Sequence, residues 1–144
     1  MFGSRSGFNS LCHFVVSNLK IHYPDIERVV YTCKNESVIK SQDKNKLEKL
    51  ISYGFKEKIY LCEYEKEIEY KTKYAAGRAG YIERNFAMID ESDFCVFYYD
   101  ENYKPPKRKN KNSNVFEYQP NSGTAVAFKY AKRKNKKIIN VFGG

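Results

Sequence analysis

The stretch GYIERNFAMIDESDFCVFYY, residues 80–99, carries the pattern that decides the fold. Its second half, residues 93–99, is apolar nearly throughout, as expected of a central strand covered on both faces. The first half, residues 80–91, places three apolar side chains at the three- and four-residue steps of one helix face: Ile82, Phe86 and Ile89. A helix followed at once by a buried strand is typical of α/β proteins with a parallel sheet.

The rest of the chain continues this alternation. We expect strands over residues 28–33, 58–62 and 137–142, and a short helix over residues 44–53. A helix over residues 123–135 would turn four side chains inward: Val126, Ala127, Tyr130 and Ala131. Near the N-terminus a helix capped by Asn9 or Ser10 has apolar residues at helical spacing: Phe8, Leu11, Val15 and Leu19.

Two segments lack a clear period. Residues 63–78 are charged and rich in tyrosine, and we interpret them as an irregular loop or loose helical turn. Residues 101–119 form a polar excursion that is long for a connection in a compact domain. No internal repeat or boundary is visible, so we expect a single domain over residues 1–144, with a mainly parallel sheet of about five strands and helices on both faces.

Composition limits the function classes. The chain is 42% hydrophobic and 30% charged, with no apolar run long enough for a membrane span and no secretory signal, so we expect a cytoplasmic protein without a membrane partner. The four cysteines, Cys12, Cys33, Cys62 and Cys95, lie in apolar runs without a CxxC pair. They are expected to be free thiols, and we expect neither a metal site nor a cofactor.

The net charge of +9 is concentrated in residues 104–111 and 129–137. Solvated surface lysines are the simplest explanation, a basic rim or lid that attracts a phosphorylated ligand is the second, and nucleic-acid binding is the third.

Parallel sheets bind ligands beyond the carboxyl ends of their strands, at helix N-termini. This rule points to residues 3–9, to the start of the helix over residues 80–91, and to residues 121–124. The first segment has the composition of an anion cradle, with glycines, hydroxyls and a guanidinium. The candidate ligand-binding residues are Gly3, Ser4, Arg5, Ser6, Gly7, Arg84, Asn85, Ser122, Gly123 and Thr124.

Each candidate also has a simpler explanation. The Gly/Ser-rich start of the chain can be flexible, Ser122 or Thr124 can merely cap a helix, and Arg84 can be a surface arginine. A cation one turn into a helix opposes the helix dipole, which favours a ligand-facing role for Arg84. Only Met1 and Phe2 precede Gly3, so the first strand is either a stub or continues into residues upstream.

Three motifs together resemble the SLOG superfamily: FGSRSG (residues 2–7), IERNFAMIDESDFCVFYY (82–99) and NSGTAVAFKYAKRKNKKIINVF (121–142). This superfamily contains the Lonely Guy (LOG) phosphoribohydrolases, DprA-like proteins and small YpsA-like bacterial proteins. The resemblance implies a Rossmann-like, three-layer α/β/α fold that binds a nucleotide or a nucleotide-derived signal at the segments above.

One departure from the hydrolase pattern bears on catalysis. LOG enzymes have a PGGxGTxxE motif, and Ala127 stands where its catalytic glutamate would be. N-glycosidic cleavage needs a carboxylate, which alanine cannot supply. We therefore expect a non-catalytic binder, such as a sensor, regulator or sequestering protein of a bacterium or phage. The alternatives are a phosphoribohydrolase or nucleoside transferase that uses a relocated carboxylate such as Glu83, and a nucleic-acid-binding protein. The tyrosines of residues 64–81 also suggest a homo-oligomer.

Overall fold

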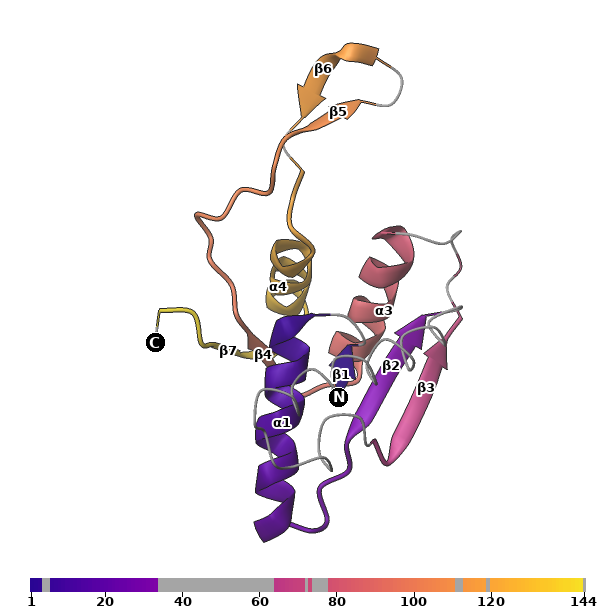
Figure 1. Ribbon diagram of the computed structural model, residues 1–144, viewed down its shortest axis with the longest axis vertical. Helices are drawn as coiled ribbons and strands as arrows, with labels where there is room; N and C mark the ends of the chain where they lie inside the picture. The colour runs from indigo at the N-terminus through magenta and orange to yellow at the C-terminus, as the bar shows by residue number, and fades with distance from the viewer. Residues whose placement is uncertain are drawn as a thin grey trace, which may run out of the picture. The chain divides into compact units, whose positions relative to one another are not determined.

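The computed structural model describes residues 1–3, 6–33, 64–71, 73, 78–110, 113–118 and 120–143. The chain divides into two compact units, Met1–Arg84 and Asn85–Gly144, and the boundary falls inside helix α3 (Arg78–Asp90) (Figure 1). The predicted helix over residues 44–53 and the predicted strand over residues 58–62 lie outside the described residues.

The first unit contains a three-stranded parallel sheet in the order β1-β2-β3 (Figure 1). Strand β1 (Phe2–Gly3) has two residues and pairs with β2 (Val29–Cys33), with Phe2 opposite Val30. The stub predicted for the first strand therefore takes part in the sheet. Strand β2 confirms the strand predicted over residues 28–33, because its valines and aromatic residue favour extended backbone.

Strand β3 (Lys66–Tyr70) corrects the prediction of an irregular loop over residues 63–78. It pairs with β2 along its whole length, from Val29 opposite Lys66 to Cys33 opposite Tyr70. In the segment KEIEY only Ile68 and Tyr70 are not charged, and they share one face of the strand. The three charged residues, Lys66, Glu67 and Glu69, are exposed. A strand with so few apolar residues has a weak sequence pattern, and its charges suit the outer position in this sheet.

Helix α1 (Gly7–His22) confirms the predicted helix, but its cap and its buried face differ from the prediction. Ser6 is the N-cap, in place of Asn9 or Ser10, and its Oγ accepts a hydrogen bond from the Asn9 amide at 3.0 Å. The apolar positions are largely exposed: Leu11 (57%), Val15 (49%) and Leu19 (44%). The buried residues of α1 are His13 and Ser17, which are four positions apart and share one face.

Two sets of contacts explain why α1 buries His13 and Ser17 and exposes its apolar residues. They are aromatic packing around His13 and a polar cluster around Arg28, which we call the clamp. The His13 ring contacts the rings of Phe2 and Tyr64, with centroids 5.4 and 4.5 Å away. Ser17 accepts a hydrogen bond from Nη1 of Arg28 at 3.0 Å. Helix periodicity shows which side chains share a face, but it does not show which face the tertiary contacts cover.

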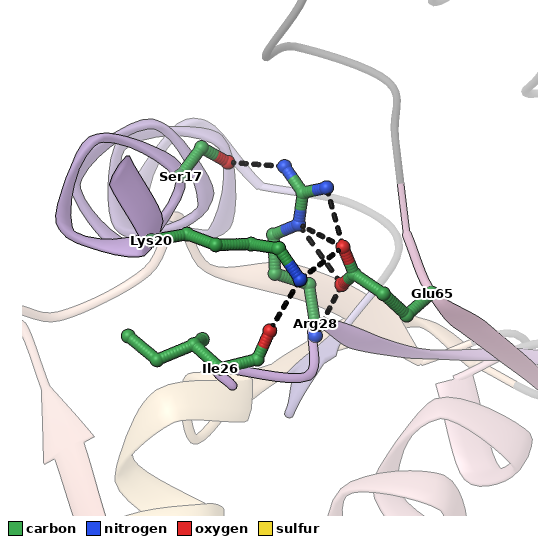
Figure 2. Close-up of polar contacts among 5 residues, drawn as sticks. All are labelled: Ser17, Lys20, Ile26, Arg28 and Glu65. Atoms are coloured by element: carbon green, nitrogen blue, oxygen red, sulfur yellow. Dashed lines mark hydrogen bonds and ion pairs between the residues drawn. The ribbon is translucent and has the colours of Figure 1, made fainter. Parts of the chain in front are cut away.

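The clamp joins α1 to the starts of β2 and β3 (Figure 2). Arg28, only 6% exposed, donates to the Glu65 carboxylate from Nη2 at 2.6 Å, from Nε at 3.0 and 3.1 Å, and from its backbone amide at 2.5 Å. Lys20 completes the arrangement, with Nζ 2.9 Å from Glu65 Oε1 and donating to the Ile26 carbonyl at 2.6 Å. These bonds, chiefly those from Arg28, hold the pKa of Glu65 far below its ordinary value.

The second unit contains β4 (Phe94–Phe97), α4 (Gly123–Arg133) and β7 (Lys137–Asn140). Strands β4 and β7 pair in parallel, and α4 packs against them. The core confirms three of the four inward positions predicted for α4, because Ala127 and Ala131 are buried and Tyr130 packs against them. Val126 is only half-buried and lies outside this cluster, where Phe128 packs instead. Its buried members are Ile89, Cys95, Phe97, Ala127 and Ala131.

Strand β4 confirms the predicted strand over residues 93–99, but not its burial on both faces. Cys95 and Phe97 are buried, whereas Phe94 and Val96 are 59% and 50% exposed. The side chain of Asn140 extends the pairing with β7, because it accepts from the Tyr99 amide at 3.0 Å and donates to the Tyr99 carbonyl at 2.9 Å. The side-chain amide of Asn140 thus adds one more pair of hydrogen bonds beyond the last backbone pair of β4 and β7.

The polar excursion contains a hairpin that the sequence did not predict. Strands β5 (Arg108–Asn110) and β6 (Ser113–Tyr118) pair antiparallel, with an irregularity between Lys109 and Asn110. All other strand pairs in the described residues are parallel, which agrees with the predicted α/β class. The described strands nevertheless form three small sheets, whereas one sheet of about five strands was predicted.

Candidate anion-binding site

The carboxyl end of β1 brings together two candidate site residues of the first unit, Gly3 and Arg84. A Cβ built on Gly3 would lie 3.0 Å from Arg84 Nη2 and 3.0 Å from Asn9 Nδ2. Any larger side chain at this position must therefore displace a guanidinium or an amide. Glycine at position 3 allows two nitrogen groups to approach the end of the strand.

Arg84 is 4% exposed, so the surface-arginine explanation is wrong. Its guanidinium carbon lies 5.1 Å from the centre of the Tyr81 ring, a cation–π contact one turn earlier in α3. The dipole argument was also misplaced, because α3 begins at Arg78 and puts Arg84 well inside the helix. The informative property of Arg84 is its burial, since arginine is almost never fully buried unless it is paired.

The N-terminus of α1 follows this strand end after the short connection over residues 4–6. Ser6 caps the helix, and Gly7, its first residue, is exposed. A Cβ on Gly7 would meet no described atom within 4 Å. Helix N-termini carry partial positive charge and amides that favour anions. Ser4 and Arg5 lie outside the described residues, and their predicted roles stay predictions.

Glu83, the carboxylate that the enzyme alternative would use for catalysis, accepts structural hydrogen bonds. Its Oε1 accepts from the Tyr70 hydroxyl at 3.0 Å, and both carboxylate oxygens accept from the Lys73 amide, at 3.0 and 3.2 Å. The hydrogen bond to Glu83 raises the pKa of Tyr70. These contacts tie the end of β3 to α3 and account for a glutamate at this position without catalysis.

The second unit contains the other candidates. Ser122 is the N-cap of α4 and accepts from the Ala125 amide at 3.0 Å, so the capping explanation is confirmed. Gly123 and Thr124 are exposed in the first turn of that helix. Asn85 is half-buried on α3. Because these residues belong to another unit than Gly3, their sharing one site with it stays a prediction.

Ala127, the residue compared above with the glutamate of the LOG motif, is buried in the core of the second unit with Ala131. A carboxylate there would lose its hydration among apolar side chains. Alanine at this position is therefore explained by helix packing.

Sequence reasoning missed Asn9 as a site residue, because it interpreted Asn9 as a helix cap. Its position two residues beyond a Gly/Ser-rich loop was the available signal. The tyrosines of residues 64–81 were interpreted as an oligomer surface, but those described pack within their own unit. Tyr64 contacts His13, Tyr70 donates to Glu83, and Tyr81 contacts Arg84.

Three of the cysteines lie in the described ranges, Cys12, Cys33 and Cys95, and all are free thiols. Burial raises the pKa of Cys12 and of Cys95. In the same ranges, His, Cys, Asp and Glu side chains form no group of three or more that could hold a metal ion. None of the described helices has the length and hydropathy to span a membrane.

Comparison of the chain with protein-family models, with curated proteins and with solved structures finds no match. The resemblance to the SLOG superfamily therefore depends on the three sequence motifs alone. The site is characterised by its own geometry: a glycine at a strand end, two side-chain nitrogen groups beside it, and a helix N-terminus that follows.

Proposed function

We propose that the protein binds a nucleotide or a nucleotide-derived small molecule at the carboxyl end of β1 without cleaving it. The observation that carries the proposal is the crowding at Gly3, where Arg84 Nη2 and Asn9 Nδ2 both lie 3.0 Å from the position of a Cβ. A guanidinium, an amide and helix N–H groups are all donors, and phosphate oxygens are acceptors. The phosphate of the ligand would contact these groups.

The surrounding fold supports this placement. Parallel strands β1, β2 and β3 and helix α1 form a strand–helix–strand arrangement, in which ligands bind at the carboxyl edge. We propose that the complete chain has the Rossmann-like α/β/α fold of the SLOG superfamily.

A binding role is favoured over hydrolysis by the two carboxylate positions. Ala127 supplies no acid or base, and Glu83 already accepts hydrogen bonds from Tyr70 and Lys73. A sensor, a regulator and a sequestering protein would all use a site of this kind.

Replacing Ser6 by aspartate separates folding from binding. Aspartate caps helices as well as serine does, so the unfolding free energy should change by less than about 0.5 kcal/mol. Its charge, however, would repel a phosphate at the same amides, and nucleotide affinity should fall at least about tenfold. Thermal unfolding and calorimetric titration with nucleoside mono- and diphosphates measure the two effects.

Asn18→Asp is the matched control, because it adds the same charge to α1 three turns away from the cap. Asn18 is half-buried near the far end of the helix. The variant should leave the affinity within about twofold of wild type, since salt screens charges that are separated by more than a Debye length. If Ser6→Asp folds normally and binds nucleotide as tightly as wild type, the phosphate does not lie at this helix end.

A further inference from the structure

The β5–β6 hairpin and the segment before it form a basic, aromatic surface that the nucleotide site does not use. We call residues 103–109 together with Glu117 and Tyr118 the basic arm. Four of its cationic side chains are exposed: Lys104, Lys107, Arg108 and Lys109. Two tyrosines are exposed with them, Tyr103 at 59% and Tyr118 at 49%.

The register of the hairpin pairs two cations of the basic arm, Arg108 and Lys109, with residues of β6. Arg108 is the cross-strand partner of Tyr118, so the two side chains leave the same face of the hairpin. Lys109 is opposite Glu117, whose carboxylate is the only one in residues 102–118, against five Lys and Arg in that range. The net charge of this stretch is thus +5 − 1 = +4. One face combines a guanidinium with a ring, and the arm as a whole is positive.

We propose that the basic arm binds single-stranded nucleic acid, with its cations on phosphates and Tyr103 and Tyr118 stacked on bases. Single strands are bound by this combination, because every base offers a ring face and the backbone is a continuous line of charge. An acidic protein would use the same cations and rings, so a chain that binds no oligonucleotide in the titration below would favour that partner and overturn the proposal. A membrane surface would favour exposed aliphatic side chains, and the described residues of the arm contain none.

The test is fluorescence anisotropy of labelled oligo-uridine and oligo-deoxythymidine, each of about 16 nucleotides, with the full chain over a series of salt concentrations. Binding should weaken linearly in a plot of log K against log salt. The triple variant Lys107→Ser, Arg108→Ser, Lys109→Ser should reduce the slope by about 2, which is about 0.7 for each lost phosphate contact. The double variant Tyr103→Ala, Tyr118→Ala should weaken binding at least about tenfold without changing the slope.

A matched control removes three exposed lysines of the first unit, Lys66→Ser, Lys71→Ser and Lys73→Ser, and should leave the slope near that of wild type. An equal loss of slope in this control would show that net charge alone is responsible, and would overturn the proposal. So would a tyrosine double variant that binds as well as wild type. Because the altered side chains are exposed, thermal unfolding should be unchanged in every variant.

The basic arm and the nucleotide site are separate proposals with separable failures. The arm variants should keep nucleotide affinity within about twofold of wild type, and Ser6→Asp should keep oligonucleotide binding. Loss of one activity without the other then identifies which proposal is wrong.

Discussion

Glu65→Gln is expected to lower the unfolding free energy by about 2–3 kcal/mol, a large fraction of the stability of a small domain. The substitution keeps the volume of the side chain but removes the charge that Arg28 pairs with. Arg28 is buried, so its guanidinium would remain desolvated with weaker acceptors. Urea denaturation followed by circular dichroism measures the change.

Glu69→Gln is the matched control, because it makes the same substitution at an exposed position of the same strand. It should change stability by less than about 0.5 kcal/mol. Equal stability of the Glu65 variant and this control would contradict the clamp shown in Figure 2.

The pH dependence of the unfolding free energy is a second measurement on the Glu65→Gln variant. Because the pKa of Glu65 is lower in the folded protein than in the unfolded chain, its contribution is complete above the unfolded-state pKa. That contribution is lost progressively as pH falls below about 5, because the carboxylate is protonated in the unfolded chain while it is still ionised in the folded protein. The stability difference between wild type and Glu65→Gln should therefore shrink from neutral pH towards acid. A difference that is constant over this range would contradict the assignment.

Arg84→Met is expected to weaken nucleotide binding by about thirty- to a thousandfold. Methionine fills much of the space of arginine without its charge, and loss of a buried charged donor to a ligand costs about 2–4 kcal/mol. Calorimetric titration measures the affinity, and the retained volume at Gly3 keeps the packing there.

The control is Arg78→Met, on the same helix but at an exposed position. It should leave affinity within about twofold of wild type. Equal losses in both arginine variants would mean that general charge, not the contact at Gly3, attracts the ligand.

Local pattern predicted the elements whose apolar residues are unambiguous. Residues 93–99 and 123–135 predict a strand and an amphipathic helix, and the structure contains both as β4 and α4, although β4 is buried on one face only. The strand β3 was missed because KEIEY has two apolar residues among charges, and its stability comes from pairing with β2 and from the clamp at Glu65. Cross-strand partners distant in sequence are not visible in a local pattern.

Only part of the candidate site was predicted, because contacts between residues distant in sequence are not visible in a local pattern. Gly3 and Arg84 were chosen from strand-end and helix-start positions, and the structure places them together. Asn9 lies within the predicted ligand segment of residues 3–9, but the position of its Nδ2 group beside Gly3 was not predicted, because helix capping explains an asparagine there equally well. The outward face of α1 was also unpredictable, because the contacts that bury His13 and Ser17 come from Tyr64 and Arg28.

The most direct test of the central claim is a nucleotide titration of ¹⁵N-labelled protein followed by backbone amide chemical shifts. Binding of a phosphate at the carboxyl end of β1 predicts saturable shifts of the Gly3, Gly7 and Phe8 amides, at the same midpoint as the calorimetric titration. Nucleoside mono- and diphosphates at millimolar concentration that leave these three amides unmoved would contradict the account.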